Sequence, residues 1–210
     1  MPLNETSLGR YPKSVFCLEG EWTDDLRHPS SIEPILQLLR NRDPRFAYIH
    51  RFVGTDAELR RYLTKWVLKR YATFPILYLA CHGVSGSFLF SSSRRAHAVT
   101  LDEIEECLED KCRGRVICLG ACDSLDAEGR RIERFLEKTR ALAVCGYKGS
   151  VDWMKSTAFE LMLLAELQAS GPNVSGMRAA NRRLKVEAAS LVKSLGFRMV
   201  VRKGRRPASP

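Results

Sequence analysis

The sequence predicts an α/β fold built on a mostly parallel sheet. Short apolar runs of strand length alternate with amphipathic helix patterns between residues 14 and 201, and neither an internal repeat nor a low-complexity block interrupts them. Strands that alternate with helical crossovers form parallel sheets. Hydrophobic residues make up 45% of the chain and charged residues 28%, which is typical of globular proteins. At 210 residues, we expect one domain spanning residues 1–210.

Six apolar runs have the length expected of strands. They lie at residues 14–18, 46–53, 76–81, 116–121, 141–146 and 196–201. Residues 86–93 indicate a hairpin or an exposed loop between the third and fourth of these strands. We therefore expect a central sheet of about six strands.

Helix patterns fill the intervals between these strands. Three of them start at capping-box spacings, which are Ser30-x-x-Glu33, Thr55-x-x-Glu58 and Thr100-x-x-Glu103. Further helices are predicted over residues 126–139, 157–169 and 177–194, of which the second is strongly apolar and the third is basic. Residues 1–13 are predicted to be a flexible lead-in, and residues 202–210 a basic tail.

Two of the predicted strands end on reactive side chains. Residues 76–81 lead into His82 and Gly83, and residues 116–121 lead into Cys122. The carboxyl ends of parallel strands share one edge of a sheet, where ligands bind in open α/β folds. A thiol becomes a strong nucleophile when a nearby imidazole takes its proton. The N–H groups of Gly83 and Cys122 could stabilise the oxyanion that such an attack produces.

These strand ends resemble a known family. A strand ending in His82-Gly83, followed by a strand ending in Ala121-Cys122-x-Ser124, resembles the caspase-like (clan CD) cysteine peptidases, particularly the CHAT (separase-related) branch. A strand that ends in Gly146, a Val-Asp pair at residues 151–152 and an apolar helix follow in the same order. The resemblance implies a three-layer fold with helices on both faces of the sheet.

The resemblance also implies roles for particular residues. Cys122 would be the nucleophile, His82 the group that activates it, and Gly83 part of the oxyanion hole. Asp152 matches the acidic position of the family near the specificity pocket, which favours cleavage after a basic P1 residue, and Ser124 is assigned with it to substrate binding. Asp152 could equally be a helix N-cap or first-turn carboxylate.

We expect no metal and no other cofactor. His50 and His97 lack ligand-like spacing to another histidine or to a cysteine, and no glycine-rich phosphate-binding motif follows the first strand. Four of the seven cysteines fall inside predicted core strands, which argues against a disulfide framework and favours a reducing, cytoplasmic compartment. No segment has the apolar length of a membrane span or the pattern of a signal peptide.

Two alternatives stay open beside a peptidase that acts on a protein or peptide. The caspase signature Gln-Ala-Cys-Arg-Gly is absent, so the chain could be an inactive signalling or adaptor module of the same fold. Residues 178–206 hold ten Lys or Arg and one Glu, or +9 of the total charge of +10, and could contact an acidic partner or nucleic acid. A solvated helix face would explain the same charges.

The third possibility is a nucleotide-processing enzyme with an acidic rim at Glu19 and Glu21, although a solvated loop is the simpler interpretation of these two residues.

Overall fold

The computed structural model describes residues 13–25, 27, 30–84, 86–92, 97–126 and 129–203. The predicted lead-in up to residue 12 and the predicted tail from residue 204 lie outside the described residues.

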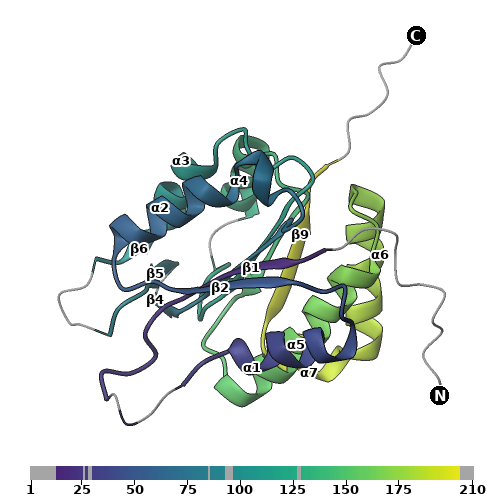
Figure 1. Cartoon of the computed structure of the whole chain (residues 1–210). Coiled ribbons are helices and arrows are strands. Elements are labelled where there is room, and N and C mark those ends of the chain that lie inside the picture. The colour runs from purple at the N-terminus through teal and green to yellow at the C-terminus, as the bar shows by residue number, and fades with distance from the viewer. Residues whose placement is uncertain are drawn as a thin grey trace.

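A six-stranded sheet forms the centre of the molecule (Figure 1). Its strands lie in the order β2 (Tyr48–Phe52), β1 (Val15–Glu19), β3 (Ile76–Ala80), β7 (Val116–Gly120), β8 (Ala143–Tyr147) and β9 (Phe197–Val201). The first five are mutually parallel, and β9 pairs antiparallel with β8. The mostly parallel sheet predicted from the sequence is confirmed. A small antiparallel sheet of β4 (His82–Val84), β5 (Ser87–Leu89) and β6 (Val99–Thr100) follows β3.

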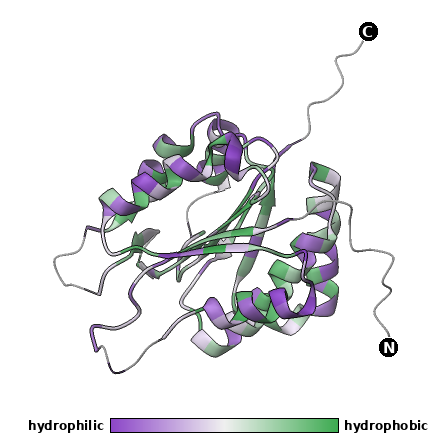
Figure 2. Cartoon of the chain, viewed as in Figure 1, coloured by the Kyte–Doolittle hydropathy of each residue, from purple (hydrophilic) through white to green (hydrophobic). Residues whose placement is uncertain are grey.

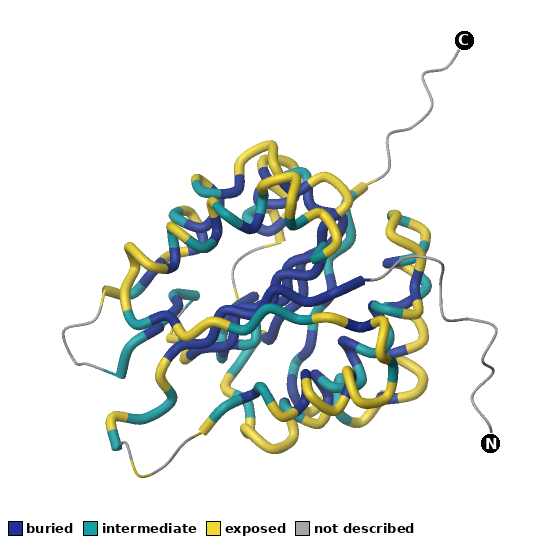
Figure 3. Tube along the Cα trace, viewed as in Figure 1, coloured by how far each residue is buried: buried dark blue, intermediate teal, exposed yellow. Residues whose placement is uncertain are grey.

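Helices cover both faces of the central sheet (Figure 1). One face carries α2 (Asp56–Trp66), α3 (Leu101–Leu108) and α4 (Gly129–Thr139). The other carries α1 (Glu33–Arg42), α5 (Trp153–Ala169), α6 (Val174–Glu187) and α7 (Ala189–Ser194), and a short 3-10 helix, η2 (Lys69–Tyr71), precedes β3. The inner strands β1, β3, β7 and β8 are hydrophobic and lie buried between these two layers, whereas the edge strands β2 and β9 are partly exposed (Figures 2 and 3). Every residue of β1, β3 and β8 is buried, as expected for strands covered on both faces.

The helix starts partly follow the predicted capping boxes. Thr100 caps α3 with both reciprocal bonds, and the Thr55 side chain caps α2. The box predicted at Ser30 is wrong: α1 begins after Ile32, whose N–H donates to the buried carboxylate of Glu19 rather than to a capping side chain. Asp152 caps α5 and starts it at Trp153, earlier than residue 157. The basic helix predicted over 177–194 is broken at Ala188 into α6 and α7.

Candidate active site

The sheet register brings the two reactive strand ends together. Strand β3 pairs with β7 in parallel, and Ala80 lies opposite Gly120. The Cys81 N–H continues the ladder by donating to the Gly120 carbonyl at 3.3 Å. His82 and Cys122, each two residues past this pair, therefore emerge at the same edge and at the same height on neighbouring strands, which lie about 5 Å apart in a sheet.

Gly83 occupies a position at which the chain has no room for a side chain. A Cβ atom at this residue would lie 1.8 Å from the Cys122 carbonyl oxygen and 2.9 Å from the Cys122 nitrogen. The backbone that follows His82 is thus packed directly against the backbone of Cys122. Only glycine permits this approach, and the approach fixes the two reactive residues relative to each other.

The sulfur of Cys122 is held by the loop that follows β8. The Val151 N–H donates to Cys122 Sγ at 3.4 Å, and Sγ lies 4.0 Å from the Ser150 hydroxyl. A backbone donor of this kind stabilises a thiolate more than a thiol. Asp123, the next residue, has a positive φ of 52°, an uncommon conformation for a residue other than glycine and one often found at functional turns.

Burial and location together separate Cys122 from the other cysteines of the chain. Four of them, at positions 17, 81, 118 and 145, are buried in or beside the predicted core strands, and Cys112 is buried as well. Burial raises the pKa of the Cys81 thiol well above its ordinary value, so Cys81 is a poor nucleophile although it lines the same cavity. Cys107 is partly buried, lies beside Arg60 outside this cavity, and also has a pKa raised by burial. Cys122 is the accessible thiol at the edge of the sheet.

The imidazole of His82 is oriented by a backbone carbonyl. His82 is exposed, and its Nε2 lies 2.8 Å from the carbonyl oxygen of Trp22, which can only accept a hydrogen bond. Nε2 therefore carries the proton, and in a neutral ring Nδ1 is free to take one. The Trp22 ring packs edge-on against the imidazole, with ring centroids 5.2 Å apart. This third group could not be predicted from the sequence, because a backbone carbonyl is common to every residue type.

A cavity of about 130 Å³ opens beside these residues. Its lining residues come from three parts of the chain: Trp22 and Ile32, the residues at and just after the ends of β3 and β7, and Val151 with the first turns of α5. Its acidic lining residue is Glu160, which is only 5% exposed and belongs to the apolar helix predicted over residues 157–169. A lone carboxylate on the buried face of that helix was the signal that could have revealed it.

Glu160 is a buried acid with two tyrosine partners. Tyr78 and Tyr147 each donate a hydroxyl hydrogen bond to its carboxylate, the second at 3.0 Å. Burial raises the pKa of Glu160 from 4.5 to about 7, although both hydrogen bonds act in the opposite direction. A Cβ atom at Gly120 would come within 3.1 Å of Glu160 Oε1, so the carboxylate lies against the end of β7, two residues before Cys122.

In the structure, the side chains of Asp152 and Ser124 form hydrogen bonds with nearby backbone groups. Asp152 is exposed at the N-cap of α5, where its carboxylate accepts from the Lys155 N–H at 2.9 Å, and it is not among the residues that line the cavity. Ser124 is 2% exposed, donates to the Leu119 carbonyl and accepts from the Tyr147 N–H. These bonds tie the Cys122 loop to the sheet. Substrate contacts by either residue stay predictions.

The acidic rim considered as a third possibility at Glu19 and Glu21 does not form. Glu19 is the last residue of β1 and is completely buried, so the simpler interpretation of a solvated loop is wrong for it as well. Glu21 is exposed and accepts hydrogen bonds from Ser91 and Ser92.

Within the described residues, no group of His, Cys, Asp or Glu side chains could hold a metal ion. The helices in this part of the chain are all too short or too polar to cross a bilayer.

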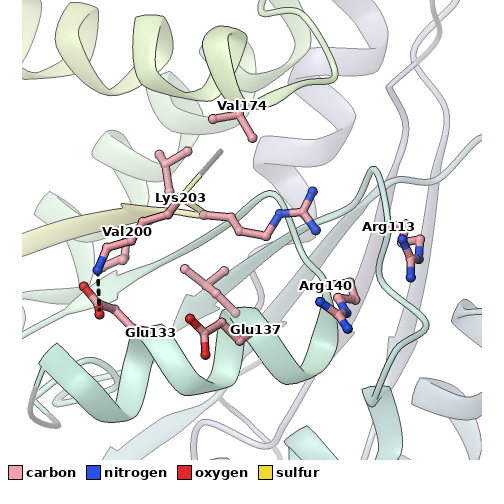
Figure 4. Close-up of a pocket in the computed structure, with 10 residues that line it drawn as sticks. Arg113, Glu133, Glu137, Arg140, Val174, Val200 and Lys203 are labelled. Atoms are coloured by element: carbon pink, nitrogen blue, oxygen red, sulfur yellow. Dashed lines mark hydrogen bonds and ion pairs between the residues drawn. The ribbon is translucent and has the colours of Figure 1, made fainter. Parts of the chain in front are cut away.

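A larger cavity, of about 490 Å³, lies at the opposite edge of the sheet (Figure 4). It is bounded by α4, the start of α6 and the end of β9, and Lys203 pairs with Glu133 across it at 3.0 Å. Its described lining residues include neither a histidine nor a cysteine. The candidate chemistry therefore belongs to the smaller cavity.

Comparison of the fold with solved structures defines its class. The crystal structure of caspase-1 from Spodoptera frugiperda matches with a TM-score of 0.54 and 11% sequence identity, over 96% of this chain and 94% of that chain. The Drosophila initiator caspase Dronc matches with a TM-score of 0.46 and 12% identity, over 78% of this chain and 67% of that one. The match to caspase-1 shows that the chain has a caspase-like α/β fold, with helices on both faces of its sheet.

The sequence itself belongs to one family. A family model described as "Family of unknown function (DUF6642)" matches residues 12–201, so the chain is a member of that family. No curated protein matches the chain by sequence.

Proposed function

We propose that the chain is a cysteine endopeptidase that cleaves a protein substrate with a Cys122–His82 dyad. The observation that carries this proposal is the register of β3 and β7, which delivers an accessible thiol and an oriented imidazole to one cavity. The caspase-like fold agrees with it. Within that class, the motif around Cys122 favours the CHAT branch, and the many unpaired cysteines favour a reducing, cytoplasmic location.

The reaction begins with transfer of the Cys122 proton to Nδ1 of His82. The thiolate attacks the carbonyl carbon of the scissile peptide, and the N–H groups of Gly83 and Cys122 are the candidate donors to the resulting oxyanion. Collapse of this intermediate breaks the C–N bond, and His82 returns its proton to the leaving amine. Water then attacks the thioester while His82 takes one of its protons, and collapse releases the carboxylic acid and restores the thiol. No cofactor is needed for these steps.

The acids near the cavity favour a basic residue at P1. Glu160 lines the same cavity as Cys122. In its ionised form, the Glu160 carboxylate would pair with a Lys or Arg side chain that enters this cavity. Asp152 lies at the start of the same helix and could contact a substrate at the rim. Because binding of a cation favours the ionised form of Glu160, a basic P1 side chain would offset the cost of its burial.

Cleavage of a peptide library randomised at P1 tests the proposal. We expect cutting after Arg or Lys by the wild type and none by Cys122→Ala or His82→Ala. The isosteric pair Glu160→Gln and Asp152→Asn then identifies the P1 contact, since the variant that removes it should lose the basic preference by at least tenfold. Equal cleavage by the wild type and both dyad variants would reject the peptidase.

A non-catalytic adaptor is the second candidate function. Arg178, Arg182 and Lys185 are exposed on α6 at a spacing that places them along one stripe of the helix. Such a stripe could contact an acidic protein surface or nucleic acid. This function predicts an unreactive Cys122 and partner binding that weakens steeply as salt is raised.

A further inference from the structure

A buried carboxylate, Glu19, is linked to the candidate dyad through Trp22. Glu19 has no exposed surface, yet it lies at the end of β1, next to β3, the strand that leads into His82. Four donors surround its two oxygens: the Trp22 indole at 2.6 Å, the Ser31 hydroxyl at 2.7 Å, the Ile32 N–H at 2.8 Å and His50 Nε2 at 2.6 Å. Burying a carboxylate is costly unless such bonds replace water, so this arrangement is a built one.

Glu19 fixes the residue that orients the catalytic imidazole. Trp22 donates its indole N–H to Glu19, and its own carbonyl accepts from His82 Nε2 at 2.8 Å. The backbone before Trp22 is also tied down, because the Gly20 N–H donates to the Ala80 carbonyl and the Glu21 N–H donates to the Phe90 carbonyl. The anchored indole and these two backbone hydrogen bonds together hold the segment that presents the Trp22 carbonyl to His82.

We propose that Glu19 is a positioning residue, which holds His82 in the Nε2–H tautomer through Trp22 and so leaves Nδ1 free to take the Cys122 proton. This inference rests on the proposed function for its purpose, but not for its geometry. His50 extends the chain of contacts from the neighbouring strand β2, where it lies between Glu19 and Glu33, whose Oε2 is 3.7 Å from His50 Nδ1.

The charge of Glu19 suits this task. Burial alone would raise the pKa of Glu19, but the hydrogen bonds from His50, Trp22, Ser31 and the Ile32 N–H together lower it below its ordinary value. The carboxylate is therefore ionised at neutral pH and acts only as an acceptor. A charged acceptor forms a stronger hydrogen bond with the Trp22 indole than a neutral one would.

The test measures the tautomer of His82 by ¹⁵N NMR of the imidazoles, with the His82 signals assigned from His82→Ala. Trp22→Phe keeps an aromatic ring but removes the indole N–H together with part of the ring that packs on His82, and Glu19→Ala removes the acceptor. Glu19→Gln keeps an amide oxygen that can still accept from Trp22. The matched control is Glu33→Gln, the same chemical change in a neighbouring carboxylate that contacts His50 but does not contact Trp22.

We expect the wild type, Glu33→Gln and, in large part, Glu19→Gln to show the Nε2–H tautomer. Trp22→Phe and Glu19→Ala should show a mixture of His82 tautomers. In both variants, iodoacetamide should alkylate Cys122 at least about tenfold more slowly than in the wild type. If Glu19→Ala does not fold, Trp22→Phe decides alone. An unchanged His82 tautomer in Trp22→Phe would overturn the inference. A wild type with the expected tautomer but without peptidase activity would reject the proposed function and leave the positioning role intact.

Discussion

Replacing Glu160 with Gln should change how the stability of the protein depends on pH. In the unfolded chain this carboxyl ionises near its ordinary value of 4.5, whereas burial holds its pKa at about 7 in the folded protein. Between these two values, the folded protein keeps a proton that the unfolded chain has lost. The free energy of unfolding of the wild type therefore falls as pH rises through this interval, and it levels off above the folded pKa.

The size of the effect follows from the same two values. Each pH unit in the interval from 4.5 to about 7 is worth 1.36 kcal/mol, so ionised Glu160 costs the fold about 3 kcal/mol above neutral pH. Gln has no charge and avoids this cost. The advantage of Glu160→Gln over the wild type should thus grow by about 3 kcal/mol between pH 4.5 and 7.5 and stay constant at higher pH.

Urea unfolding of both proteins at a series of pH values measures this difference. Other titrating groups contribute equally to both proteins and cancel when the two free energies are subtracted. A difference that does not vary with pH would refute the reasoning, because it would mean that Glu160 is not a buried acid with a raised pKa. The same result would also remove the main support for the idea that a basic P1 residue offsets the cost of burying ionised Glu160.

Other substitutions test the site and the fold. Gly83→Ala should destabilise the protein by about 1–3 kcal/mol and abolish activity, because its Cβ collides with the backbone of Cys122; Gly149→Ala, at a position open to solvent, is the control, and equal melting temperatures for the two would contradict the packing. Thr100→Ala should lower the free energy of unfolding by about 1 kcal/mol through loss of the α3 capping box, without any effect on Cys122. An unchanged unfolding midpoint would show that this cap contributes nothing.

The strand pattern was the most reliable part of the sequence. Each of the six predicted apolar runs became a strand of the central sheet. The inner strands are mostly apolar because they are buried on both faces, whereas the edge strands β2 and β9 are partly exposed. The order of the strands is a tertiary property, which the pattern of apolar runs along the chain does not contain. The bounds of α5 shifted because Asp152 is the residue that caps it.

The dyad candidates could be found in the sequence because reactive side chains at strand ends are visible there. Their supporting groups were hidden for different physical reasons. Glu19 looks like a loop residue, since nothing local shows that four donors converge on it. Trp22 acts through its carbonyl, which every residue has. Glu160 is one polar residue within an apolar helix, and its importance depends on which strand ends that helix covers.

The alkylation rate of Cys122 tests the central claim most directly, because it needs no substrate. Iodoacetamide labelling, followed by mass spectrometry of the Cys122 peptide, should be at least tenfold faster in the wild type than in His82→Ala at neutral pH. The buried cysteines should stay unlabelled in both folded proteins. Equal labelling rates at Cys122 would contradict the claim that His82 activates this thiol.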